Sequence, residues 1–334
     1  MKIQDCVLSI DVAVFAPLVR NQPEDCWVEA RNSGAIPPEV YELYQRAGFL
    51  SFGAGPRFLS DGENILFSYF AMTLNCLMET LTDSKEQLAA FVKEHNLTYD
   101  PGKKVRGEPW EPAASTRAQR HLRDLLIALQ GSLDTFADLI ALLLTGRIPG
   151  LRVGRAQFVQ IENWIAQPLS LSAVVATPYD SHLVDLYDAL RPLVLAGPPE
   201  QDWLPLMHML RNKGAHLGQR IFRQVGLHDT DLRFHVFLPR QWPYIWEKHM
   251  KPHDPNAKPD PALMTKLLQE TLINQDLLTF TRCLHGKVKG VVSAGASVAN
   301  RMYAAFESFA VNQAALAELE RNSEAYEFEY FIER

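Results

Sequence analysis

The sequence predicts a mainly α-helical protein: a helical bundle with small β additions and a C-terminal helical extension. A long apolar stripe with the helical period of 3.6 residues runs through residues 115–145. Capping residues precede several other apolar stretches, and strand-like alternation is confined to short segments. We therefore expect an N-terminal loop and strand segment (1–60) packing on a bundle (61–226), followed by the extension (227–334).

The composition is that of an ordinary globular protein that can bury a sizeable core. Of the 334 residues, 47% are hydrophobic and 22% are charged. The net charge of −6 argues against a surface that coats nucleic acid generally, so an RNA contact requires a local basic patch. The cysteines lack C-x-x-C spacing and are expected to be reduced, mostly buried thiols: Cys6, Cys26, Cys76 and Cys283.

Neither a secretion signal nor a membrane span is expected. Asp5 and Asp11 interrupt the apolar run near the N-terminus. The most apolar stretch, residues 127–144, is interrupted by Gln130 and by the two carboxylates Asp134 and Asp138. The sequence therefore predicts a cytoplasmic protein that has no membrane partner.

The first hundred residues combine an ambiguous start with helices. Residues 1–20 are compatible with strands or with a helix, and a loop-rich segment follows with a short helix near residues 38–47. In a capping box, a serine is followed three residues later by Glu or Gln. Two such boxes predict two separate helices, Ser60–Glu63 before residues 63–81 and Ser84–Gln87 before residues 85–95.

The strongest structural signal follows a basic linker at residues 100–114. Eight apolar side chains in the helix predicted over residues 115–145 lie within about 60° of one line. These are Leu122, Leu125, Leu126, Leu129, Leu133, Phe136, Ile140 and Leu143. Beside this stripe, Arg123, Gln130 and Asp134 are predicted to share a polar flank.

The remaining elements are predicted from the same signals. Periodic apolar residues and caps indicate helices over residues 155–167, 180–196 with a kink or break at Pro192, 202–226, 262–284 and 291–312. Alternation indicates a short strand over 232–238 and a strand-like tail over 325–332.

The helix predicted over residues 202–226 carries the most suggestive polar residues. Asp202 is the expected N-cap and Gly226 the expected C-terminal stop. Its middle reads Arg211-Asn212-Lys213-Gly214-Ala215-His216, and no carboxylate occurs between residues 211 and 223. At about 100° per residue, His208, Arg211 and Asn212 share one face.

Arg211, Asn212 and His216 reproduce the arginine, polar residue and histidine spacing of the HEPN superfamily, which this region resembles. In that family the pattern lies on the last helix of a small helical bundle, and residues 60–225 supply the helices that such a bundle requires. The resemblance implies a metal-independent endoribonuclease without a cofactor, whose product carries a 2′,3′-cyclic phosphate. It also implies a homodimer through the motif helix, and a toxin–antitoxin or antiviral setting with an antitoxin or regulatory protein as a further partner.

The residue chemistry is compatible with RNA cleavage. A histidine titrates near neutral pH, so we assign His216 as general base or acid. A guanidinium remains charged and can donate twice to one phosphate, so we assign Arg211 to the transition state. Asn212 would orient the imidazole or the phosphate.

Two interpretations apply to each of the remaining candidate site residues. Asp134 either accepts a hydrogen bond from Arg211 or His216, or is a solvated carboxylate. His208 either assists or lies at the edge of the core. Lys213, Arg220 and Arg223 either bind RNA phosphates or form a solvated basic face.

Two further functions are compatible with the same residues. One is a non-catalytic helical interaction module, and the other is a nucleotide-binding protein that uses Arg211 on phosphate. His249 and His253 do not suit a metal site, because Pro252 interrupts a helix there. The basic segment 286–290, Gly-Lys-Val-Lys-Gly, lacks phosphate-loop spacing.

Overall fold

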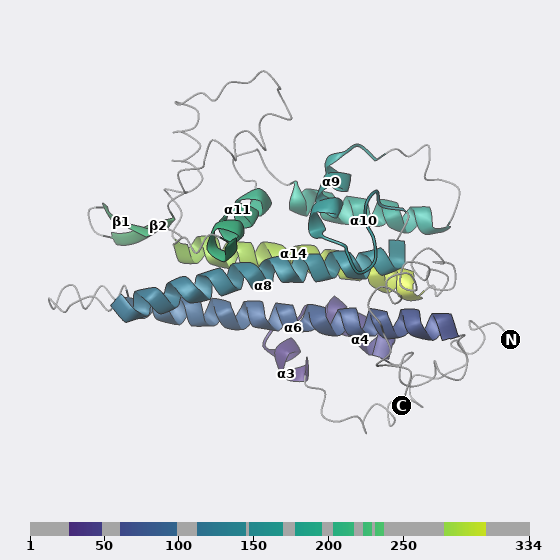
Figure 1. Ribbon diagram of the computed structural model, residues 1–334, viewed down its shortest axis with the longest axis horizontal. Coiled ribbons are helices and arrows are strands. Elements are labelled where there is room, and N and C mark those ends of the chain that lie inside the picture. The colour runs from purple at the N-terminus through teal and green to yellow at the C-terminus, as the bar shows by residue number, and fades with distance from the viewer. Residues whose placement is uncertain are drawn as a thin grey trace, which may run out of the picture. The chain divides into compact units, whose positions relative to one another are not determined.

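The described part of the chain is mainly α-helical (Figure 1). The computed structural model describes residues 27–48, 61–98, 112–144, 147–169, 178–195, 203–216, 223–228, 231–236 and 277–304. The helices are α3 (Trp27–Asn32), α4 (Pro38–Gly48), α6 (Asp61–Thr98), α8 (Pro112–Leu144), α9 (Phe158–Ala166), α10 (Pro178–Val194), α11 (Trp203–His216) and α14 (Leu277–Ala304). The strands are β1 (Arg223–His228) and β2 (Asp231–Val236).

The chain forms two compact units, each built from separate stretches of sequence. The first unit comprises Met1–Thr82, Leu133–Leu190 and Val292–Arg334, and the second comprises Asp83–Ser132 and Arg191–Val291. The boundaries fall inside α6, α8, α10 and α14, so each of these helices contributes to both units.

The apolar stripe predicted for the long helix is confirmed in α8. All eight predicted side chains are buried, from Leu122 to Leu143. The periodic apolar residues that predicted the helix over residues 155–167 are also buried in α9: Phe158, Ile161, Trp164 and Ile165. Pro192 lies inside α10, as expected for a kink position. Periodicity located these helices because their burial follows one face.

The break predicted between residues 81 and 85 is wrong, because α6 continues through it. Ser84 is 1% exposed inside the helix rather than at an exposed cap. Gln87 Oε1 lies 2.8 Å from His121 Nδ1 on α8, and Arg117 Nε donates to Glu94 Oε2 at 2.9 Å. The apparent capping residue Gln87 therefore makes a tertiary contact. The residue numbers of the contacting partners fall along α8 as they rise along α6, so the two helices run antiparallel here.

The burial of α6 and of two cysteines differs from what composition suggests. Apolar residues lie almost all round α6, as in a helix buried inside a bundle, yet Met72 is 54% exposed. Cys76 and Cys283 are free and exposed, contrary to the expectation of mostly buried thiols, while Cys6 and Cys26 lie outside the described residues. Residue spacing alone does not reveal which face of a nearly uniformly apolar helix is covered.

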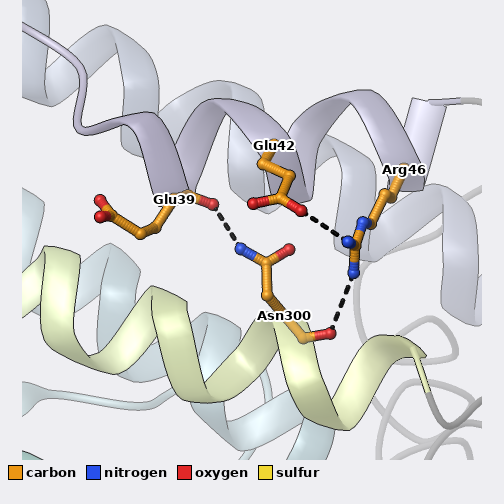
Figure 2. A network of polar contacts seen from close by, with 4 residues as sticks. All are labelled: Glu39, Glu42, Arg46 and Asn300. Atoms are coloured by element: carbon orange, nitrogen blue, oxygen red, sulfur yellow. Dashed lines mark hydrogen bonds and ion pairs between the residues drawn. The ribbon is translucent and has the colours of Figure 1, made fainter.

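In the first unit, α4 is attached to α14 by polar contacts. Asn300 Nδ2 donates to the Glu39 carbonyl oxygen at 2.8 Å, and Arg46 Nη1 donates to the Asn300 carbonyl oxygen at 3.3 Å. Figure 2 shows these contacts, with Arg46 also paired to Glu42 on its own helix. Further along, Ser293 Oγ donates to Glu39 Oε2 at 2.8 Å. The predicted short helix near residues 38–47 is thus confirmed and has a defined neighbour.

A single helix, α14, spans the predicted gap between two C-terminal helices. It runs from Leu277 to Ala304 and includes Gly286 and Gly290, so the predicted break at residues 285–290 is wrong. A glycine costs roughly 1 kcal/mol in a helix interior. Buried apolar residues on both sides, including Leu284, Val288 and Val291, offset that cost through packing. Residues 262–276 and the predicted tail strand lie outside the described residues.

The predicted helix over residues 202–226 ends early. The described part of α11 ends at His216, and residues 223–226 belong to β1. This strand pairs with β2 in antiparallel register, with Arg223 opposite Val236 and His228 opposite Asp231. The strand predicted near residues 232–238 is confirmed, but its partner was predicted as helix. Pairing with β2 satisfies backbone groups that a continued helix would otherwise satisfy.

One described helix is long and apolar enough to cross a membrane. It is the segment Thr116–Leu144 of α8, and 67% of its most apolar window is buried inside the protein. The charged positions noted from sequence therefore do not disqualify this segment by composition. A mostly buried core helix meets the same criteria, so the finding is weak evidence for a span.

Candidate functional site

The motif helix α11 is anchored in the second unit by its apolar side. Trp203, Leu204, Met207 and Leu210 are buried. The Trp203 indole Nε1 donates to the Leu193 carbonyl oxygen at 3.1 Å. That carbonyl lies in the last turn of α10, where helix carbonyls have no partner within the helix. These contacts hold the start of α11, eight residues before Arg211.

Arg211 and Asn212 are brought together on α11. Arg211 is half-buried and Asn212 is exposed. Arg211 Nη1 donates to Asn212 Oδ1 at 2.9 Å. This contact restricts a long side chain that would otherwise lose rotamer freedom on binding a ligand. In this structure Asn212 orients the guanidinium of its neighbour, and its predicted contact with the imidazole or the phosphate stays a prediction. His208, one turn earlier, is half-buried on the same helix.

The other motif residues are located by backbone alone. Lys213 and His216 belong to α11, and their side chains lie outside what the structure describes, as does the whole of Arg220. Arg223 begins β1, so it does not lie on the helix predicted over residues 202–226. The prediction that residues 211–216 are helical is confirmed.

Asp134 has a described partner that the sequence did not suggest. Its Oδ1 accepts a hydrogen bond from the Phe158 backbone N–H at 2.9 Å, at the first residue of α9. An anionic acceptor at a helix N-terminus satisfies a free N–H and interacts favourably with the helix dipole. This contact gives Asp134 a structural role in the first unit.

One turn further along α8, Asp138 holds the connection that precedes α9. Its Oδ1 accepts from the Gly154 N–H at 2.6 Å, and Tyr69 donates its hydroxyl to Oδ2 at 3.3 Å. Burial raises the pKa of Asp138, and burial together with this carboxylate raises the pKa of Tyr69 to about 12. Gly154 has a positive φ of 71°, a conformation that suits glycine. Two carboxylates one turn apart beside an apolar stripe could have indicated this anchor.

We expect the two uncharged replacements of Asp138 to differ. Asp138→Ala removes the acceptor of the Gly154 N–H and should lower the free energy of unfolding by about 1–2 kcal/mol. Asp138→Asn keeps an acceptor and should cost less. Because the folded-state pKa is raised, the ionised carboxylate is disfavoured, and wild type should gain stability relative to Asp138→Asn as pH falls. Urea unfolding of the three proteins between neutral and acidic pH measures both effects.

That pH trend also provides the control. Asp138→Ala and Asp138→Asn both lack the titrating group, so their stability difference should stay constant with pH. A wild-type protein that loses stability relative to Asp138→Asn on acidification would contradict the buried carboxylate.

A second titratable cluster, in the second unit, was not recognised from sequence. His285 on α14 is 9% exposed, and its pKa is lowered to about 4 by burial and then by Lys85 and Lys289. Lys85 comes from α6, two hundred residues away. The sequence signal that could have found this cluster is the absence of Asp and Glu throughout α14.

Within the described ranges, no group of three or more His, Cys, Asp or Glu is placed to hold a metal ion. Comparison with known proteins assigns neither a family nor a function to the chain. No family model matches the chain, no curated protein matches it, and no solved structure matches it.

Proposed function

We propose that this protein is a metal-independent endoribonuclease of HEPN type, with Arg211, Asn212 and His216 as its reactive group. The observation that carries the proposal is the hydrogen bond from Arg211 to Asn212 on a helix that includes His216. A guanidinium that is half-buried and held by a neighbouring amide is prepared to bind an anion. The sequence spacing to the histidine is that of the family which this region resembles.

The reaction uses the RNA's own nucleophile. A base removes the proton of the 2′-hydroxyl, and the resulting oxygen forms a bond to the adjacent phosphorus. The bond from phosphorus to the 5′-oxygen breaks, and an acid gives that oxygen a proton, which leaves a 2′,3′-cyclic phosphate and a 5′-hydroxyl. His216 performs one proton transfer. Arg211 stabilises the charge that develops on the phosphate oxygens, and Asn212 holds Arg211.

A homodimer would complete this site. In the proposed arrangement, two copies of α11 face each other, so that two histidines and two arginines line one RNA-binding cleft. This would supply separate groups for the base and the acid. Lys213 and Arg220 would contact flanking phosphates, and an antitoxin or regulatory protein acting in the cytoplasm would restrain the enzyme.

The test is cleavage of a labelled single-stranded RNA in EDTA. Wild type should cut it, whereas His216→Ala and Arg211→Ala should each cut at least about 100-fold more slowly. Arg211→Lys should also fail, because an ammonium cannot donate in the paired geometry of a guanidinium. Arg301→Ala is a matched control, since it removes an exposed arginine of α14 whose partner is Asp185.

The substrate supplies a second control. RNA with a single 2′-deoxy nucleotide at the cleaved position should remain intact, because it lacks the nucleophile, and product ends should carry cyclic phosphate. Equal cleavage by wild type and His216→Ala, or uncut RNA with all proteins, would refute the nuclease. In the second case, Arg211 and Asn212 would remain as a phosphate-binding pair without catalysis.

A further inference from the structure

The helix α14 is strongly basic in a protein whose net charge is −6. Across its 28 residues it contains no Asp or Glu. It does contain four permanent cations and one histidine: Arg282, Lys287, Lys289, Arg301 and His285. Local positive charge of this kind is what a polyanion requires when the whole protein is acidic.

Two glycines leave part of one side of α14 without side chains. Leu284, Val288 and Val291 are buried on the opposite side. Gly286 is exposed and Gly290 is half-exposed, one turn apart. A Cβ atom added at either glycine would meet nothing within 4 Å. The helix backbone is therefore open to close approach along this stretch.

Cations flank the two glycines on both sides. At about 100° per residue, Arg282 and Lys289 lie on one side of the line through Gly286 and Gly290, and Lys287 lies on the other. Among the residues that the structure describes, neither Arg282 nor Lys287 forms an ion pair. Their charges are thus not neutralised by a described carboxylate.

Lys85 adds a further cation from α6. It and Lys289 are close enough to His285 to lower the pKa of this histidine, in addition to the effect of burial. A basic group whose charged neighbours disfavour a further positive charge lies in a region of positive potential. Lys85 of α6 therefore adds to the positive charge around His285.

We propose that the face formed by Arg282, Gly286, Lys287, Lys289 and Gly290, with Lys85 beside it, binds the phosphate backbone of single-stranded RNA. We call it the α14 basic face. Lysine and arginine supply most phosphate contacts in such complexes, and glycine permits a phosphate to approach the backbone. This RNA is the substrate of the site on α11, and that identification depends on the proposed function. Both helices contribute to the second compact unit.

The chemistry of this face favours RNA over a protein partner. Protein interfaces usually bury large apolar or aromatic anchors. The exposed large hydrophobic residues of the described structure are Val28, Met72, Leu97, Ile127 and Leu195, and none of them lies on α14. Recognition here would instead be electrostatic and tolerant of base sequence.

The experiment measures binding of fluorescent single-stranded RNA by anisotropy, with the full chain in the His216→Ala background so that RNA stays intact. Salt is varied from about 50 to 200 mM. The triple variant Arg282→Gln, Lys287→Gln and Lys289→Gln should bind at least tenfold more weakly at low salt. Its slope of log Kd against log salt should fall by about 2, since each lost phosphate contact contributes about 0.7 on a single strand.

A second triple variant is the matched control: Arg46→Gln, Arg123→Gln and Arg301→Gln. It removes the same charge from exposed arginines that each pair with a carboxylate. Its RNA affinity and salt slope should stay close to those of the parent. Unfolding midpoints of both triple variants show whether each remains folded.

The outcomes separate this inference from the proposed function. Loss of binding in the first triple variant alone supports the α14 basic face, even if wild type never cuts RNA. Equal loss in both triple variants would show a general charge effect and overturn it. Unchanged binding in both would also overturn it, and would leave the face to an acidic protein.

Discussion

Replacing Gly295 with alanine is expected to lower the free energy of unfolding by about 1–3 kcal/mol, although alanine normally stabilises helices. A Cβ atom at this position would lie 2.0 Å from Cζ of Phe136. The ring has little room to move, because Phe136 is fully buried and its centroid lies 6.5 Å from that of Phe158. Relief therefore requires α14 and α8 to separate locally, which opens gaps elsewhere.

The same helix provides the control. Gly286→Ala meets nothing within 4 Å, so it should raise stability by up to about 1 kcal/mol through helix propensity. Urea unfolding with an unchanged m-value measures both variants. Adding Phe136→Leu to Gly295→Ala should recover part of the loss, as expected for neighbours in contact. If Gly295→Ala stabilised the protein as Gly286→Ala does, the close packing of α14 on α8 would be wrong.

The protein is expected to lose stability on mild acidification, because the unfolded state binds a proton at His285 more readily than the folded state does. This group has its pKa lowered from 6.5 to about 4 in the folded state. The neutral form is therefore favoured by folding, and its contribution is fully present above pH 6.5 and lost as pH falls towards 4. The loss should reach roughly 2 kcal/mol at pH 5 and about 3 kcal/mol at pH 4.

The variant His285→Gln isolates this effect. It cannot bind the proton, so any packing cost should be the same at all pH values, and its stability should fall less than that of wild type between pH 7 and 4. Lys85→Met should raise the pKa of His285 and so reduce the acid loss, because it removes a repelling charge. Parallel pH profiles for wild type and His285→Gln would contradict a buried neutral histidine.

Local pattern predicted the helices whose burial follows one face. The stripe from Leu122 to Leu143 and the apolar residues of α9 are periodic because one side of each helix meets the core. The prediction of helix ends was wrong where residues that resemble a capping box make other contacts. Ser84 and Gln87 resemble a helix start, yet they lie inside α6, where Gln87 contacts α8.

The candidate site was likewise predictable from sequence only in part. The spacing from Arg211 to His216 and its helical setting could be predicted from sequence. The hydrogen bond that holds Arg211 could not, because it depends on side-chain conformations. The attachment of Asp134 to the start of α9 could not be predicted either, nor could the proximity of Lys85 to His285. Each involves residues distant in sequence.

By itself, the sequence determined that the described chain is mainly helical, and which faces of α8 and α9 are buried. Helical period and hydrophobicity are properties of neighbouring residues, so they can be read locally. Only the tertiary structure decided that glycines 286 and 290 stay helical, that Gly295 is packed against Phe136, and that residues 223–228 pair as a strand. The two glycine features depend on packing between segments distant in sequence, and the strand depends on hydrogen bonds to its partner β2. In each case these contacts outweigh local preference.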